Sequence, residues 1–151
     1  MRSALLVSLL ALACVASPLE PRLYGAWQSN RELTLAEFRK VPGITSERLK
    51  ALSDPDLFGH LVTIYQPHDA IVIYEGECSI SPYKVLDRSD SYVDIGYYDS
   101  FFEESVERRI FFEPGSIWLR VGDAREIFSP AEFDKLEVQH SCLRTLLDTS
   151  R

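Results

Sequence analysis

The chain has 151 residues, of which 46% are hydrophobic and 26% are charged, and its formal net charge is −7. This length favours one domain, and the composition is that of a globular protein rather than a disordered one. The negative balance argues against nucleic acid and against an anionic membrane surface as partners, because both are bound through clustered Lys and Arg.

The N-terminus has the features of a targeting segment. Arg2 supplies a short positive region, and residues 4–16 form an apolar run that matches a signal-peptide core and is too short to span a bilayer. We therefore expect an extracytoplasmic protein, periplasmic or secreted. Its expected parts are a signal peptide at 1–16, a linker at 17–22, a folded domain at 23–142 and a C-terminal tail at 143–151.

Two cleavage sites fit the small residues at the end of the apolar run. Cleavage after Ala16 would release an ordinary secreted protein. Cleavage after Ala13 would make Cys14 the first mature residue, and residues 11–14 loosely resemble the lipobox of bacterial lipoproteins. Cys14 is thus a candidate lipidation site and would be the chain's only link to a membrane, unless the N-terminal segment stays uncleaved as an anchor.

The predicted elements begin with a strand at 23–29 and two short helices. A capping box of Thr34 and Glu37 predicts a helix from about Leu35 to Val41, which Pro42 ends. Thr45 is a candidate N-cap for a second helix near 46–53. Helices this short are not stable alone, so both are expected to lie on a sheet.

Short strands and polar turns follow from residue 61 to residue 128. Residues 61–65 and 70–74 are rich in β-branched and aromatic side chains and predict a hairpin, and residues 79–82 are expected to turn. Residues 106–112 alternate strictly, with Val106, Arg108, Ile110 and Phe112 on one face. Further strands are expected at 83–88, 92–98, 117–121 and 125–128.

A final helix is predicted from Pro130 to about His140, with Ser129 as its N-cap. The whole pattern predicts a mainly β protein, an antiparallel up-and-down barrel-like sheet of about eight strands. Two short helices follow its first strand, and one helix ends it.

Export changes the meaning of the cysteines. With Cys14 in the targeting region, Cys78 and Cys142 remain as an even pair in an oxidising compartment, which predicts a disulfide. Two buried free thiols and a metal pair are the alternatives. The metal pair lacks a C-x-x-C companion.

No motif for catalysis is present in the sequence. It contains no H-E-x-x-H, no G-x-S-x-G and no Gly-rich phosphate loop. We therefore expect no catalytic residue, no metal and no cofactor. A hydrolase site assembled from distant parts of the chain is the least favoured alternative.

Tyrosines recur along the predicted strands, and a small barrel either fills its interior with side chains or holds one small ligand. Tyr65, Tyr74 and Tyr97 are the candidate pocket residues, because phenols give a cavity apolar walls with polar handles. The alternative is that they are ordinary strand aromatics. Trp27 is expected in the core at one end of the fold.

The Gly25-Ala26-Trp27 triplet at the start of the first strand resembles the lipocalins and the wider calycin group. The resemblance implies that Trp27 plugs the closed end of a barrel, under an arginine from a late strand such as Arg120 or Arg125. A disulfide to the C-terminal segment and a helix after the last strand match that family in kind.

The resemblance implies carriage of a small hydrophobic or amphipathic ligand, and we expect no catalysis. Together with the recurring tyrosines, it makes Trp27, Tyr65, Tyr74 and Tyr97 the candidate ligand-binding residues. The alternative is a cell-envelope interaction or inhibitor module with a filled core. That module would act through the loop at 99–104, where Phe101 and Phe102 would form an exposed patch.

Overall fold

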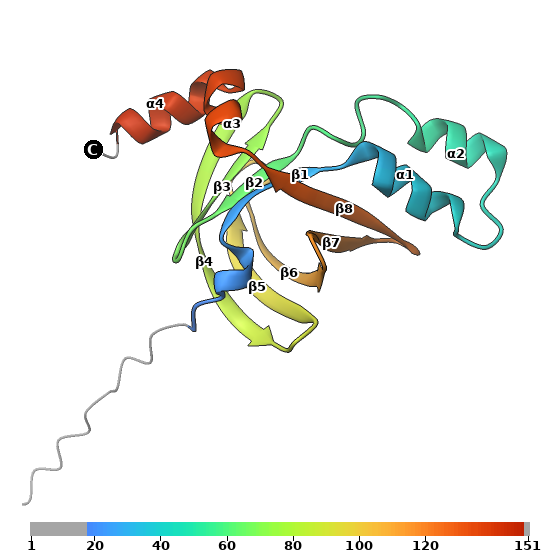
Figure 1. The fold of residues 1–151 in the computed structure, drawn as a ribbon, viewed down its shortest axis with the longest axis horizontal. Helices are drawn as coiled ribbons and strands as arrows, with labels where there is room; N and C mark the ends of the chain where they lie inside the picture. Colours follow the sequence, from blue (N-terminus) through green and yellow to red (C-terminus); the bar gives the residue numbers. More distant parts are fainter. Residues whose placement is uncertain (1–17, 150–151) are drawn as a thin grey trace, which may run out of the picture.

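The computed structural model describes residues 18–149, and within them the chain forms a closed eight-stranded barrel with four α-helices and one 3-10 helix (Figure 1). Each strand pairs antiparallel with the next, and β8 pairs with β1 to close the barrel. The predicted fold class is therefore confirmed. The strands are β1 Gly25–Ser29, β2 Val62–Tyr65, β3 Asp69–Tyr74, β4 Glu77–Arg88, β5 Tyr92–Asp99, β6 Glu104–Glu113, β7 Ser116–Val121 and β8 Ala124–Ala131. The helices are η1 Pro21–Leu23, α1 Arg31–Arg39, α2 Ser46–Leu52, α3 Phe133–Gln139 and α4 Ser141–Thr149.

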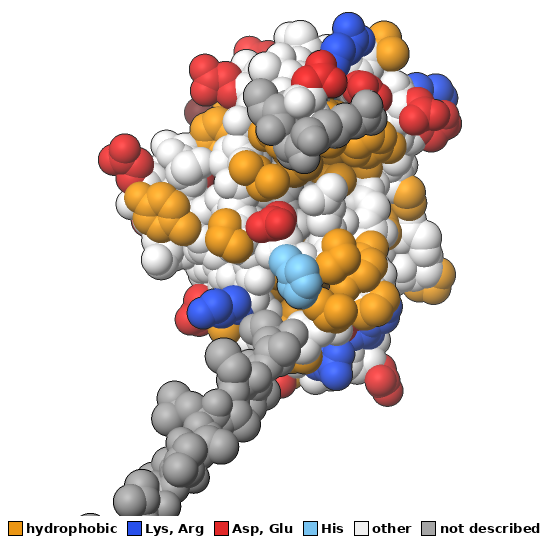
Figure 2. Space-filling model, turned by 90° about the vertical axis from the view of Figure 1, so that its left-hand side faces the viewer, with side chains coloured by type: hydrophobic (Ala, Val, Ile, Leu, Met, Phe, Trp, Pro, Cys, Tyr) orange, Lys and Arg blue, Asp and Glu red, His pale blue; other side chains and the backbone are white. Residues whose placement is uncertain are grey.

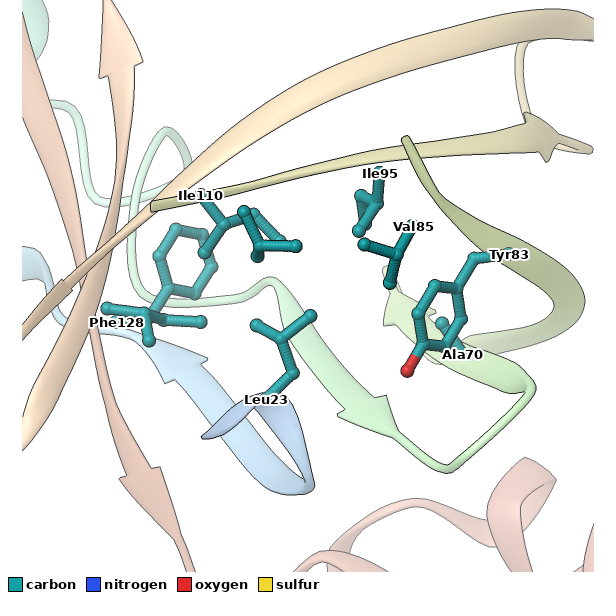
Figure 3. Packing of buried hydrophobic residues seen from close by; sticks show 9 residues of the cluster. Leu23, Ala70, Tyr83, Val85, Ile95, Ile110 and Phe128 are labelled. Atoms are coloured by element: carbon teal, nitrogen blue, oxygen red, sulfur yellow. The ribbon is translucent and has the colours of Figure 1, made fainter. Parts of the chain in front are cut away.

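Two-residue alternation explains why these segments form a barrel. Every second side chain of a strand points inward, and the strand register puts apolar side chains opposite each other, as at Val93 and Ile110 or at Ile117 and Phe128. Figure 3 shows such side chains converging from separate strands, together with Leu23 from η1. The interior is thus a single apolar cluster shared by the whole barrel.

The 3-10 helix η1 closes one end of the barrel. Leu23 is fully buried there, and the indole Nε1 of Trp27 donates a hydrogen bond to its carbonyl oxygen at 2.7 Å. The guanidinium carbon of Arg22 lies 4.1 Å from the ring centroid of Phe112. These contacts attach the N-terminal segment to strands from both halves of the sheet.

The linker and first strand are therefore shorter than expected. Residues 21–23 are helical because Pro21 starts the turn and the carboxylate of Glu20 accepts a hydrogen bond from the backbone N–H of Arg22. The same carboxylate forms an ion pair with the Arg22 side chain at 2.7 Å.

Helix α1 begins four residues earlier than the capping box predicted. The side chain of Asn30 caps it by accepting from the backbone N–H of Leu33. Thr34 is instead fully buried, and its hydroxyl accepts a hydrogen bond from the backbone N–H of Ile127 in β8 at 3.0 Å. The predicted N-cap of α1 was therefore wrong, whereas Thr45 does cap α2.

Strand β4 is continuous through residues 79–82, where a turn was expected. The chain turns earlier, at Glu75 and Gly76, both of which have positive φ. Pro82 pairs with Asp69, the first residue of β3, and pairing with β5 begins only at Tyr83. Proline is accommodated because it lies where β4 exchanges one partner strand for the other.

The C-terminal part also differs from its prediction. Ser129 and Pro130 continue β8, because they pair with Gln28 and Trp27 of β1, and α3 starts only at Phe133. Residues 143–149, which were expected to belong to a tail at 143–151, form most of α4.

Helices α3 and α4 cover the outer faces of β2 and β3. Leu136 and Leu143 are nearly or fully buried against strand residues such as Val62 and Ile73. On the face seen in Figure 2, the hydrophobic side chains at the surface form separate patches with charged side chains between them. No helix within residues 18–149 is long and apolar enough to span a membrane.

Candidate functional site: a cavity inside the barrel

A cavity of about 250 Å³ lies inside the barrel. Its wall is mainly apolar and is formed by strands from all around the barrel, because the inward-pointing side chains of these strands meet there. The aliphatic and phenylalanine side chains of the wall include Leu61, Ile95, Ile110, Ile117, Leu119 and Phe128.

All four residues predicted to contact a ligand line this one cavity: Trp27, Tyr65, Tyr74 and Tyr97. Trp27 and Tyr65 come from β1 and β2, whereas Tyr74 and Tyr97 come from β3 and β5. Their meeting follows from barrel closure, since each occupies an inward position of its strand. That they contact a ligand stays a prediction.

The cavity reaches the surface between the β3–β4 turn and the β5–β6 loop. Phe102, which lines it, is 71% exposed, and Tyr98 is 51% exposed. Phe101 lines it too, with its ring edge-on to Tyr74 at a centroid distance of 6.4 Å. Only Phe102 of the two loop phenylalanines is therefore exposed, while Phe101 is half-buried in the mouth.

Asp99 organises the loop at this mouth. Its Oδ1 accepts hydrogen bonds from the backbone N–H groups of Phe101 and Phe102, at 2.9 and 3.3 Å. Such a side-chain turn holds both rings at the rim. Oδ1 of Asp99 therefore shapes the loop at the mouth and already accepts two hydrogen bonds from the backbone.

Sequence reasoning missed Arg108 as a site residue. It is half-buried and lines the cavity, with its guanidinium carbon 5.9 Å from the ring centroid of Tyr97. The signal was present, because strict alternation of β6 puts Arg108 on the same inward face as Ile110. An arginine at an inward position among apolar neighbours is the feature that could have identified it.

A carboxyl group also lies on the inward face of β8. Glu126 Oε1 accepts a hydrogen bond from the hydroxyl of Ser29 at 2.6 Å, and Ser29 in turn accepts one from the backbone N–H of Gly59. Burial raises the pKa of Glu126, while the hydrogen bond from Ser29 and the positive charge of Arg108 partly oppose that rise.

Burial also affects the phenols of the interior. It raises the pKa of Tyr65 and of Tyr97, with the charge of Arg108 acting in the opposite direction on both. It raises the pKa of Tyr83 to about 12, and the hydroxyl of Tyr83 donates to the carbonyl oxygen of Gln66 at 2.8 Å. These phenols therefore remain protonated hydrogen-bond donors at neutral pH.

Neither arginine proposed to cover Trp27 does so. Arg125 forms ion pairs with Glu37 and Glu113 and lies over the ring of Trp118, on the outer face. Arg120 pairs with Arg125 in the register of β7 and β8 and so shares that outer face. At the closed end the arginine that stacks on a ring is Arg22, which comes from η1.

The disulfide between Cys78 and Cys142 is present, with a Cα–Cα distance of 5.6 Å, and it ties α4 to the start of β4. The candidate lipidation site Cys14 and the expected signal peptide lie outside the described residues. Among residues 18–149, no group of three or more His, Cys, Asp or Glu side chains could hold a metal ion.

The fold and cavity define a class of protein, a closed antiparallel barrel with a hollow interior. Among known proteins, no family model, curated sequence or solved structure matches this chain.

Proposed function

We propose that this protein is an exported, lipocalin-like carrier that binds a small hydrophobic or amphipathic molecule inside its barrel, without catalysis. The observation that supports this proposal most directly is the cavity of about 250 Å³, which has a mainly apolar wall and an opening at the β5–β6 loop. Ligand sites are concave and mostly apolar with a few polar groups, and this cavity fits that description at its small end.

Two further features support extracytoplasmic binding. The N-terminal sequence has the pattern of a signal peptide, and a disulfide joins Cys78 to Cys142. Disulfides persist in oxidising compartments. The alternative, an interaction module with a filled core, is less favoured because the interior is hollow and Phe101 turns into the mouth instead of joining Phe102 at the surface.

Tryptophan fluorescence tests the proposal directly. The chain has two tryptophans, and Trp118 stacks on Phe111 on the outer face with ring centroids 3.9 Å apart. In a Trp118→Phe variant, emission reports on Trp27 alone, which lines the cavity. Titration with hexanol, octanol and decanol should shift that emission saturably, because an alkyl chain displaces water from beside the indole.

A matched pair of substitutions separates the cavity from the outer surface. Val72→Phe adds volume to the cavity wall, whereas Ile80→Phe adds a ring on the outward face of the neighbouring strand, where Ile80 is 49% exposed. Val72→Phe should abolish the alcohol response, and Ile80→Phe should leave it unchanged. Absence of a saturable Trp27 response to all three alcohols in the Trp118→Phe protein, without a further substitution, would exclude the proposed function.

A further inference from the structure

Arg108 is a cation in a wall that is otherwise mainly apolar. The register of β5 and β6 puts it opposite Ile95, and Ile110 and Leu119 line the cavity beside it. Its guanidinium approaches the ring of Tyr97. Long cationic side chains at such positions are rare, because removing their charge from water is costly unless a partner anion is present.

No protein carboxylate supplies that partner. Among residues 18–149, no Asp or Glu oxygen lies within 4.0 Å of the guanidinium nitrogens of Arg108. Asp99 also lines the cavity, but it lies four residues along β5 from Ile95, about 13 Å at roughly 3.3 Å per residue.

Glu126 does not replace the missing partner either. Its oxygen is hydrogen-bonded to Ser29, and it forms no ion pair with Arg108. Burial raises its pKa, which disfavours the charged form that an ion pair would need. Within residues 18–149, Arg108 therefore has no ion-paired carboxylate, and the charge of Glu126 acts on it only from beyond ion-pair distance.

The adjacent residue, Arg109, is an example of an arginine with a structural ion pair. Arg109 points to the outer face, where its Nε and Nη2 donate to both oxygens of Asp94, each at 2.7 Å. Its guanidinium carbon also lies 3.9 Å from the ring centroid of Tyr92. Of these two neighbouring arginines, Arg109 has a carboxylate as its ion-pair partner within the described part of the chain and Arg108 does not.

Two phenols share the cavity wall with Arg108. Tyr65 and Tyr97 both line the cavity, and the charge of Arg108 acts on both of them. Neither hydroxyl has a hydrogen-bond partner among the described residues, in contrast to Tyr83, which donates to Gln66. The guanidinium N–H groups and the two phenol O–H groups can all donate hydrogen bonds to an acceptor inside the cavity.

On the basis of the binding function proposed above, we propose that Arg108, Tyr65 and Tyr97 form an anion subsite within the cavity. The ligand would then be a small amphipathic molecule with one carboxylate. Its carboxylate would pair with the guanidinium of Arg108 and accept hydrogen bonds from the two phenols, and its apolar part would lie against the aliphatic wall.

The size of the cavity limits the ligand. A volume of about 250 Å³ corresponds to about eight water molecules at roughly 30 Å³ each in the liquid. A molecule with about that many non-hydrogen atoms fills it, so a medium-chain or aryl carboxylate suits the space, and a two-chain lipid does not.

Octanoate and octanol test this subsite, because they share an alkyl chain and differ in charge. Calorimetric titration should give tighter binding of octanoate than of octanol to the parent protein. Arg108→Met should weaken octanoate binding about 10- to 100-fold and leave octanol binding nearly unchanged, since a charge-assisted hydrogen bond is lost only for the anion. Arg108→Lys should retain part of the octanoate preference, because it keeps the charge without the bidentate geometry.

Arg109→Met is the matched control on the outer face, and it should bind both ligands as the parent protein does. Octanol binding by Arg108→Met also reports that this variant is folded. Equal affinity for octanoate and octanol, or an octanoate affinity that Arg108→Met does not change, would overturn the anion subsite while the carrier function stands. If the parent protein bound neither molecule, the carrier function and the subsite would both be overturned.

Discussion

Removal of the disulfide should lower the stability of the fold by a predictable amount. Cys78 and Cys142 are separated by 64 residues, so their bond excludes many extended conformations from the unfolded chain. In the chain-entropy model a loop of this length corresponds to about 4 kcal/mol at room temperature. A Cys78→Ala/Cys142→Ala variant should therefore unfold at a urea concentration about 2 M lower, for a slope of about 2 kcal/mol per molar urea.

Urea titration followed by circular dichroism measures this loss, and reductant supplies the control. The parent protein in dithiothreitol should unfold like the double variant, and the double variant should not respond to dithiothreitol. Leu136 and Leu143 should hold α3 and α4 on the barrel without the bond, so the slope should stay unchanged. A loss below about 1 kcal/mol at an unchanged slope would refute the entropic reasoning.

Substitutions at three further positions, Thr34, Leu143 and Glu126, test contacts and charges of the barrel and its helices. Thr34→Val should cost about 1–3 kcal/mol in urea titration, because it leaves the buried N–H of Ile127 without an acceptor, and Thr34→Ser should cost less since it keeps the hydroxyl. Leu143→Ala should cost about 2–5 kcal/mol, because Leu143 of α4 is fully buried against the barrel; a smaller loss would mean that α4 contributes little to the fold. Glu126→Gln should raise the melting temperature at neutral pH but not in acid. The pKa of Glu126 is raised in the folded state, so its ionisation lowers the stability of the fold progressively as the pH rises above the ordinary value of 4.5. An equal rise in melting temperature for Glu126→Gln at all pH values would contradict burial as the cause.

The site could be predicted in part. The recurrence of tyrosine along the predicted strands, together with the Gly-x-Trp triplet, supplied the four candidate residues, and all four line one cavity. Strict alternation in residues 106–112 put Arg108 on the same face as Ile110, but a single strand does not reveal whether a carboxylate from another strand neutralises it. That depends on the register of β5 with β6 and of β7 with β8, which is set by the packing of the entire barrel.

The misplaced elements have a common cause. Ser129 and Pro130 have the local chemistry of a helix start, yet they form strand because β1 needs a partner there to close the barrel. Thr34 likewise is a residue type that often caps helices, but its hydroxyl accepts a hydrogen bond from the backbone of β8 instead of from its own helix. In each case a tertiary hydrogen bond outweighs a local preference worth about 1 kcal/mol.

The amino-acid sequence by itself determined the class of fold and the sulfur pairing, because two-residue periodicity and a lone pair of downstream cysteines are local or countable properties. Only the tertiary structure decided that the interior is hollow, where it opens, and that Arg108 faces it without a carboxylate. Those properties depend on the volumes and charges that eight strands bring together, and no single segment contains that information.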